Sequence, residues 1–358
     1  MINFKLILSA IVFTIQAQLL FGVNNVWVGQ NISPWPSPQS NIDTIETRNG
    51  NRHVDFVEHW INWTADFSDM SDECTAIYNN GSVLELAWQP HNGTRGLYNS
   101  EINSGAWDSY ITSYVTAIKN WGKLMYIRPM HEWNGDWYDW SVGKNSNTNA
   151  SFIAAFQRFV NIADSVGATN IRWGFSVAQE NKGSNTFLGP YPGDSYVDYM
   201  SIDCYNWGTS HPNWPSTWQS FAICFNSAYS AFAAKGKPIF ISEIGSVEVG
   251  GNKAAWISEV YNQVRNSGNY NLVDAIIWFD TDYTAPGNQD AFQITSSTAA
   301  LNAYIAATNY VSNPLPTLST DTQAPGVPTG LFTPNVTETS VTLLQTASTN
   351  LKSALLHK

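Results

Sequence analysis

Two glutamates stand where apolar runs with the character of buried strands come to an end. Glu132 follows the run at 124–129, and Glu243 follows the run at 238–242. A buried carboxylate is costly unless it has a partner or a chemical task, so both positions are candidates for a functional site. For Glu132 the structural alternative is an ion pair with Arg128, which ends the preceding strand.

Aromatic residues follow the first glutamate closely, at Trp133, Trp137, Tyr138 and Trp140. Rings beside a carboxylic acid suggest a sugar ligand, because stacking holds the apolar face of a sugar and acid chemistry acts on its glycosidic oxygen. Cleavage needs two carboxyl groups, and a separation of about 5–5.5 Å lets one of them act as a nucleophile with retention of configuration. Desolvation by neighbouring tryptophans favours an acid that keeps its proton near neutral pH. The two glutamates therefore predict a glycoside-cleaving site.

Alternating apolar runs and helix-like segments must position these residues. We predict strands at 26–29, 53–59, 83–88, 124–129, 171–176, 199–205, 238–242 and 275–279. The clearest helices are predicted at 104–121, 150–166, 217–234, 254–265 and 299–308. Eight strands, each followed by a possible helix, predict an α/β fold that closes as a (β/α)8 TIM barrel. An open doubly wound sheet is the alternative, but the chain has no Gly-x-Gly-x-x-Gly turn to support it.

The ends of the predicted strands supply further candidates, since the functional groups of such barrels lie on the loops that follow the strands. The fourth and seventh strands approach one another across the barrel mouth, so Glu132 and Glu243 can converge on one bond. Trp88 and His91 come at the end of the third strand, and Arg128 comes at the end of the fourth. We predict that these three residues contact the substrate.

The composition favours one large domain that binds a neutral polymer. Of 358 residues, 43% are hydrophobic, 14% are aromatic and only 13% are charged, and 16 are tryptophan. The formal net charge is −11 and the Lys and Arg residues are scattered, which argues against a nucleic-acid partner. A polysaccharide fits both the acidic surface and the surplus of tryptophan. We expect the protein to act as a monomer.

The first residues have the pattern of a secretory signal. Lys5 precedes an almost unbroken apolar run at 6–13, and the predicted signal covers 1–22. No later run reaches the roughly 20 apolar residues of a membrane span. We therefore expect a secreted, extracellular protein that is free of the membrane once the signal is cleaved.

The chain after the predicted main domain at 23–311 changes in character. Residues 312–328 are rich in Pro and Thr and predict a linker. The segment at 329–358 resembles the opening of a fibronectin type III domain, but it is far too short to close such a sandwich, so we predict an incomplete β module. Three cysteines allow at most one internal disulfide, and Cys204 and Cys224 could meet if the helix after the Cys204 strand folds back.

Three motifs resemble signatures of glycoside hydrolase family 26. The segment at 128–138 resembles the acid/base signature and reads RPMHEWNGDWY. The segment at 241–245, ISEIG, is similar to the nucleophile strand, and 203–207, DCYNW, is similar to the sixth strand. The resemblance runs from about residue 25 to about residue 307, and the first motif is the most specific. It implies a secreted retaining glycosidase on a (β/α)8 barrel, with a β-glycan partner, no metal and no cofactor.

The resemblance also implies roles for individual residues. Glu132 is implied to be the acid/base and Glu243 the nucleophile. His131 is implied to lie beside the acid and to help fix the sugar and the nucleophile. Tyr205 is implied to hydrogen-bond Glu243 and keep it ionised. The structural alternatives are a hydrogen-bonded supporting residue for His131 and a strand-end core residue for Tyr205.

Two tryptophans and the residue that follows Trp88 are informative about substrate binding. Trp278 is implied to form the platform under the cleaved sugar and Trp137 to stack the sugar on the leaving side, although Trp278 could instead cap the core. Gln89 follows Trp88, where mannan-active members commonly have His and some mixed-linkage glucan-active relatives have Glu. We expect an endo-β-1,4-mannanase first, a mixed-linkage endo-β-glucanase next and a β-1,3-xylanase third. A barrel that binds carbohydrate without turnover is the alternative from another class.

Overall fold

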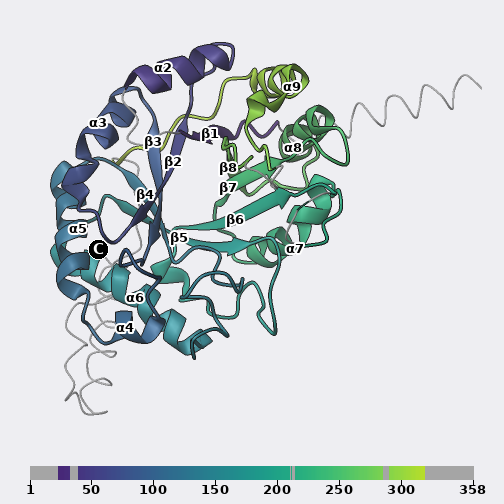
Figure 1. Cartoon of the computed structure of the whole chain (residues 1–358). Helices are drawn as coiled ribbons and strands as arrows, with labels where there is room; N and C mark the ends of the chain where they lie inside the picture. The colour runs from purple at the N-terminus through teal and green to yellow at the C-terminus, as the bar shows by residue number, and fades with distance from the viewer. Residues whose placement is uncertain (1–22, 33–38, 210, 212–213, 285–289, 319–358) are drawn as a thin grey trace, which may run out of the picture.

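The computed structural model describes residues 23–32, 39–209, 211, 214–284 and 290–318. Within them, eight strands pair in parallel and in chain order, and the first pairs with the last to close a barrel. Helices surround the strands (Figure 1). The predicted (β/α)8 barrel is therefore confirmed. The predicted signal at 1–22 and the fibronectin-like segment at 329–358 lie outside the described residues, as does the predicted linker from residue 319 onward.

The elements follow one another as strand and helix along the chain. The strands are β1 (Trp27–Asn31), β2 (Phe56–Asn62), β3 (Val83–Gln89), β4 (Met125–Pro129), β5 (Ile171–Ala178), β6 (Tyr199–Asn206), β7 (Ile239–Ser246) and β8 (Val273–Trp278). The helices are α2 (Gln39–Arg48), α3 (Ser71–Asn79), α4 (Asn99–Asn103), α5 (Asp108–Trp121), α6 (Asn149–Val166), α7 (Phe221–Ala233), α8 (Lys253–Asn266) and α9 (Thr298–Thr308). Six strands extend beyond their predicted ends toward the site, and the longest extensions are those of β2, by three residues to Asn62, and of β7, by four residues to Ser246.

Local signals in the sequence set the ends of α6, the helix after β4. The Thr148 hydroxyl accepts a hydrogen bond from Ser151 N at 3.1 Å, and the Ser151 hydroxyl accepts one from Thr148 N at 2.8 Å. This reciprocal pair satisfies backbone donors that would otherwise lack partners at the helix start. Gly167 ends the helix with φ of 73°, a left-handed conformation that glycine adopts readily. The loop from Met130 to Thr148 is thereby held between two fixed elements at the barrel mouth.

Side chains inside the barrel form three layers, because alternate residues of each strand point inward. The floor, at the amino ends of the strands, is aromatic and contains Phe56, Tyr126, Tyr199 and Phe240, which pack with ring centroids 4.7–5.3 Å apart. The middle layer is polar and contains Glu58, Glu85, Arg128, Ser176, Ser201 and Ser242. The mouth layer is built around Tyr205, Phe279 and Phe292. The aromatic floor closes the polar layer off from below, so its charges must find partners inside the barrel.

Residues just beyond α9 pack under the barrel floor. Trp27 Nε1 donates to Asn313 O at 2.9 Å, and Ser312 Oγ donates to Asp55 Oδ2 at 2.6 Å. Leu315 packs against the floor cluster. The first residues of the predicted linker therefore contact the folded domain.

The outward faces of the strands pack against the helices in one large hydrophobic cluster. Large buried side chains such as Trp256 of α8 and Tyr304 of α9 belong to it. Among the described residues, no helix is both long enough and apolar enough to cross a membrane.

Candidate active site

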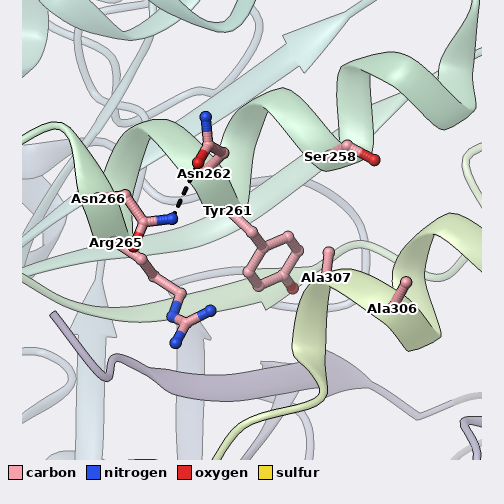
Figure 2. Close-up of a pocket in the computed structure, with 7 residues that line it drawn as sticks. All are labelled: Ser258, Tyr261, Asn262, Arg265, Asn266, Ala306 and Ala307. Atoms are coloured by element: carbon pink, nitrogen blue, oxygen red, sulfur yellow. Dashed lines mark hydrogen bonds between the residues drawn. The ribbon is translucent and has the colours of Figure 1, made fainter. Parts of the chain in front are cut away.

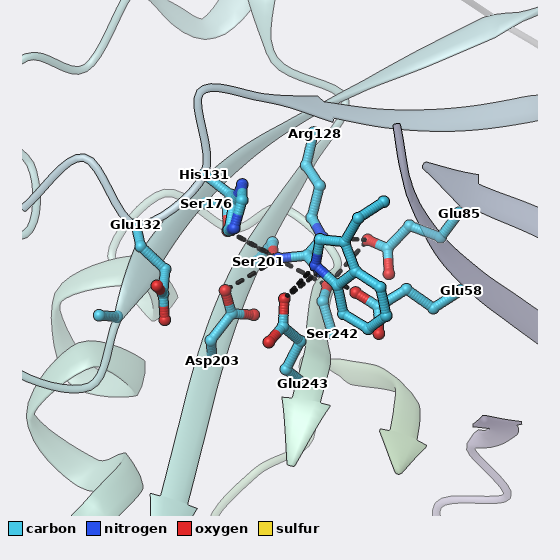
Figure 3. Close-up of polar contacts among 12 residues, drawn as sticks. Glu58, Glu85, Arg128, His131, Glu132, Ser176, Ser201, Asp203, Ser242 and Glu243 are labelled. Carbon is cyan, nitrogen blue, oxygen red and sulfur yellow. Dashed lines mark hydrogen bonds and ion pairs between the residues drawn. The ribbon is translucent and has the colours of Figure 1, made fainter. Parts of the chain in front are cut away.

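Glu132 and Glu243 lie at the carboxyl-terminal end of the barrel, and their side chains are turned toward a common space (Figure 3). Glu132 belongs to the loop between β4 and α6. Met130 and Glu132 have φ of 50° and 52°, a region that residues with a Cβ seldom adopt. Backbone hydrogen bonds hold this turn, from Gly135 N to Glu132 O and from Val142 N to Trp133 O, both at 3.0 Å. Backbone strain of this kind clusters at functional sites, where the surrounding structure holds a side chain in one direction.

The carboxyl group of Glu132 keeps its proton at neutral pH. Burial, and after it the negative charge of Glu243, raises the pKa of Glu132 to about 8. Trp137 Nε1 donates to Glu132 Oε2 at 2.7 Å and, together with the charge of Arg128, acts in the opposite direction. The two glutamates therefore interact electrostatically across the mouth. A carboxyl group that is still protonated at pH 7 meets the requirement for a general acid.

Donors from three strands hold the carboxylate of Glu243. Trp60 Nε1 of β2 donates to Oε1 at 3.0 Å, and Arg128 Nη2 of β4 donates to the same oxygen. The Tyr205 hydroxyl of β6 donates to Oε2, so the hydrogen bond implied by the sequence resemblance is confirmed. Hydrogen bonds to a carboxylate stabilise its charged form. The arrangement fixes both oxygens of the Glu243 carboxyl group.

A bulge in β7 brings Glu243 to this position. Ile202 of β6 pairs with Ile241, and the next residue, Asp203, pairs with Glu243, so Ser242 is an extra residue in β7. Consecutive residues of a regular strand face opposite sides, but a bulge breaks that alternation. Ser242 Oγ donates to Glu85 inside the barrel while Glu243 binds Arg128 there.

Arg128 is completely buried and binds carboxyl groups of the barrel interior (Figure 3). Its Nη1 lies 2.8 Å from Asp203 Oδ2, its Nη2 contacts both Glu58 and Glu243, and its Nε lies 4.0 Å from Glu85. Four carboxylates cannot all ionise around one guanidinium in a dry interior. Burial accordingly raises the pKa of Asp203 and raises that of Glu85 to about 8. The prediction that Arg128 contacts substrate is wrong, because this side chain has no accessible surface.

The two candidate histidines have different surroundings. His131 is buried, and its Nε2 lies 2.9 Å from the Tyr138 hydroxyl. Burial, followed by the charge of Arg128, holds the pKa of His131 well below its usual value, so the ring is neutral. His91 is partly exposed in the loop after β3, and its Nδ1 accepts a hydrogen bond from Gly93 N at 3.1 Å. Substrate contacts by His131 and His91 stay predictions.

Rings surround the two glutamates. A cluster at the mouth contains Trp60, Tyr205, Trp207, Phe279 and Phe292. Trp137 keeps 45% of its surface exposed beside the acid, and Tyr283 keeps 52% exposed in the loop after β8. These exposed faces can stack on sugar rings. Stacking by Trp137 on the leaving side of the substrate stays a prediction.

Trp88 and Trp278 face the helices and not the mouth. Both are fully buried. Trp88 stacks on Tyr114 of α5 at 5.0 Å between ring centroids. Trp278 lies 6.0 Å from the ring of Trp256 in α8, and its Nε1 donates to Phe292 O at 2.9 Å. The predictions that Trp88 and Trp278 contact the sugar are wrong, because their positions in β3 and β8 point outward in the strand alternation.

Three residues of the site were missed by the sequence prediction. Trp60 was missed because β2 was predicted to end one residue before it. Glu58 and Glu85 occupy facing positions of β2 and β3 and are fully buried. A carboxylate inside an apolar strand is itself a signal for an interior charge cluster, since an unpaired one would not be tolerated there.

A further pocket of the described chain lies away from the two glutamates. A surface pocket of about 250 Å³ lies between α8 and α9 (Figure 2), and it is lined by Ser258, Tyr261, Asn262, Arg265, Asn266, Ala306 and Ala307. It contains no carboxyl group. Among the described residues, no group of three or more His, Cys, Asp and Glu is arranged to hold a metal ion.

The cysteines are free thiols. Cys74, Cys204 and Cys224 are all buried. Cys204 and Cys224 contact one another between β6 and α7, as predicted, and Cys224 Sγ also lies 3.7 Å from Tyr205 O.

Comparison with known proteins identifies the family. Residues 108–266 match the profile of Glycosyl hydrolase family 26. Endoglucanase H of Acetivibrio thermocellus is 44% identical over 306 residues, which cover 84% of this chain and 32% of the relative. A mannan endo-1,4-beta-mannosidase of Bacillus subtilis is 24% identical, over 69% of this chain and 71% of the relative. The chain therefore spans about a third of the length of the first of these relatives.

Solved structures share the fold. The catalytic domain of a GH26 endo-beta-1,4-mannanase from Bacillus sp. JAMB-750 superposes with a TM-score of 0.59 at 15% identity, over 79% of this chain and 85% of that one. A modular endo-beta-1,4-mannanase from Cellulomonas fimi gives 0.58 at 15% identity, over 80% of this chain and 71% of that one. These structures show the shared barrel fold, and the family profile together with the 44% identical relative places the chain in glycosyl hydrolase family 26.

Proposed function

We propose that this chain is a retaining endo-β-glycanase. The observation that carries the proposal is that two carboxyl groups at the mouth of the barrel have different surroundings. Glu132 has its pKa raised to about 8 and can give up a proton, while Glu243 receives hydrogen bonds from Trp60, Arg128 and Tyr205. One acid and one held carboxylate are the two groups that double displacement needs.

The reaction follows from these roles. Glu132 gives its proton to the glycosidic oxygen while Glu243 attacks the anomeric carbon, and the leaving sugar departs. Glu132, now ionised, removes a proton from water, and the resulting hydroxide displaces Glu243 from the sugar. Two inversions at one carbon give net retention. Trp137, hydrogen-bonded to the acid, lies where it can support the departing sugar.

Three glycans are candidates for the substrate. β-1,4-Mannan is the first candidate, supported by the mannosidase relatives and the mannanase structures. A β-glucan is the second, and a specific observation favours it: the 44% identical relative is an endoglucanase. Gln89, in place of the His common in mannan-active members, also supports a glucan. β-1,3-Xylan is a weaker third candidate.

The test is hydrolysis of a substrate panel by the native chain. Reducing-sugar release from mannan, lichenan and β-1,3-xylan identifies the backbone, and the anomeric proton signals of the first product reveal retention or inversion. The Glu243→Ala variant is the control. Release of an inverted product rules out the nucleophilic role of Glu243. Binding to a glycan with no release by the native chain instead supports a carbohydrate-binding barrel without turnover.

We propose in addition that the chain is exported through its first 22 residues and works outside the cell as a monomer, with the barrel as the catalytic domain. The apolar run at 6–13 and the acidic composition support this location. Amino-terminal sequencing of protein from the culture medium, together with size-exclusion chromatography, tests both points. A species that keeps Met1 in the cell fraction, or a stable dimer, contradicts them.

A further inference from the structure

Trp60 occupies a position at the mouth that the family resemblance did not mark. It is an inward-facing residue of β2, two positions beyond Glu58 and paired in the ladder with the small residue Ala87. The indole is partly exposed and lies edge-on to Phe279 with ring centroids 5.4 Å apart. Its one polar atom, Nε1, points at the nucleophile and lies 3.0 Å from Glu243 Oε1.

The donors around Glu243 are divided unequally between its two oxygens. Oε1 accepts from both Trp60 Nε1 and Arg128 Nη2, whereas Oε2 accepts, among the residues that the structure describes, from the Tyr205 hydroxyl alone. A carboxylate oxygen offers about two lone-pair sites. Oε1 therefore has both sites occupied, and Oε2 has one site free.

We propose that Trp60 is a positioning residue for the nucleophile: together with Arg128 it occupies Oε1, so that Oε2 is the oxygen that attacks the anomeric carbon. The inference rests on the proposed retaining mechanism. It assigns the attacking atom and gives the indole N–H a task that a phenyl ring in the same place could not perform.

The electron balance of the step agrees with this division. Oε2 forms a bond to the anomeric carbon as the bond to the leaving oxygen breaks, and that oxygen takes the proton of Glu132. Oε1 becomes the carbonyl oxygen of the glycosyl ester, where the N–H of Trp60 still has an acceptor. When water attacks, the bond to Oε2 breaks and the negative charge returns to Glu243. Trp60 thus keeps its hydrogen bond throughout, and the carboxyl plane does not need to rotate.

Several ionisable groups face Glu243. They are Arg128 of β4, Asp203 and Tyr205 of β6, Glu85 of β3, Glu132 and Tyr138 of the loop after β4, and Tyr283 of the loop after β8. A Trp60→Phe variant leaves all of them in place. It removes one hydrogen bond to the carboxylate and keeps an aromatic ring, so its effect reports on the N–H alone.

The experiment compares the native chain with Trp60→Phe and Trp60→His. The matched control is Trp256→Phe, because Trp256 is a buried indole whose Nε1 donates to Gln219 O at 2.9 Å on the outer side of the barrel. Two readouts are used: the pH profile of kcat/KM, and the rate at which a 2-deoxy-2-fluoro glycoside labels Glu243. In Trp60→Phe we expect the labelling of Glu243 to slow about tenfold. We also expect the acidic limb of the kcat/KM profile to move up by about one pH unit, because a hydrogen bond to a charged group is lost.

The remaining comparisons separate positioning from packing. KM should change less than threefold, because the ring is retained. Trp60→His, which restores an N–H donor, should recover part of the acidic-limb shift. Trp256→Phe should lower the thermal midpoint and leave the acidic limb in place. An unchanged acidic limb and an unchanged labelling rate in Trp60→Phe overturn the proposal.

A measurement on the native chain tests the same hydrogen bond even if the Trp60 variants do not fold. In protein labelled with 15N-tryptophan, the signal of one indole N–H group should shift with pH over the same range as the acidic limb of kcat/KM. That pH-dependent shift should be absent in Glu243→Gln. If no indole signal follows the limb, the hydrogen bond is not made and the proposal is wrong. If the native chain neither hydrolyses a glycan nor is labelled, the proposed function is wrong. The proposal that Oε2 attacks the anomeric carbon is then wrong as well, even if an indole signal responds to pH.

Discussion

Replacement of Trp137 by Phe tests the acid/base role of Glu132 with the least disturbance. The indole Nε1 of Trp137 donates to Glu132 Oε2 at 2.7 Å, and this bond favours the ionised carboxylate. Removing it favours the protonated form, so the pKa of Glu132 should rise further above its value of about 8. The acid then stays protonated to higher pH, and the alkaline limb of kcat/KM should move upward.

The size of the shift follows from the exposure of the donor. A hydrogen bond to a charged group contributes about 1.5–3 kcal/mol when it is buried. Trp137 is 45% exposed, so water replaces part of the lost bond and about 1 kcal/mol remains. Since a pKa unit corresponds to about 1.4 kcal/mol, the limb should rise by about 0.7 pH units.

The assay is the pH profile of kcat/KM from pH 5 to pH 10 on the best glycan of the panel. Trp214→Phe is the matched control, because Trp214 is also 45% exposed and follows β6 at the same end of the barrel. It should leave the alkaline limb unchanged. An alkaline limb that falls or stays in place in Trp137→Phe, or an equal shift in the control, refutes the assignment of that limb to Glu132.

The remaining predictions concern activity and stability. Glu243→Ala should abolish hydrolysis. Glu132→Ala should slow hydrolysis of a polysaccharide about 10²–10⁴-fold, and should slow hydrolysis of an aryl glycoside much less, because its leaving group needs no acid. Equal losses on both substrates contradict the acid role of Glu132. Glu85 has its pKa raised to about 8 by burial, so between about pH 4.5 and pH 8 the folded chain holds a proton that the unfolded chain has lost, and the free energy of unfolding should fall as the pH rises through that window. Thermal or urea unfolding at pH 5 and pH 8 should show a smaller fall in Glu85→Gln, and an equal fall would place this proton elsewhere. Trp88→Leu should lower the free energy of unfolding by about 2 kcal/mol or more and leave KM unchanged, because the ring packs on α5; a raised KM with native stability would restore its predicted substrate role.

The barrel and its two glutamates were predictable from the sequence because their signals are local. Strand-forming runs alternate with helices that carry caps such as Thr148 and terminators such as Gly167. Glu132 and Glu243 stand where such runs end. In a parallel barrel all strand ends of one kind meet at the same rim, so sequence position alone predicts that these side chains gather there.

The errors share one cause, which is that a strand end does not reveal which way a side chain points. The place of Trp88 at a strand end and the family resemblance for Trp278 both predicted substrate contacts, but the twofold alternation of the strands turns both side chains toward the helices. Trp60 was missed because the polar pair Glu58 and His59 interrupts the apolar pattern of β2 just before it. Arg128 was taken for a substrate contact, although it lies inside the barrel.

The sequence by itself determined the fold class, the family resemblance and the choice of Glu132 and Glu243 as the two candidate carboxyl groups, since these depend on periodicity and on short contiguous motifs. Only the tertiary structure decided how Glu243 is held. Its donors Trp60, Arg128 and Tyr205 come from three strands far apart in the chain, and a one-residue bulge in β7 turns the carboxylate toward them. Contacts of that kind depend on barrel register, which no single stretch of sequence encodes.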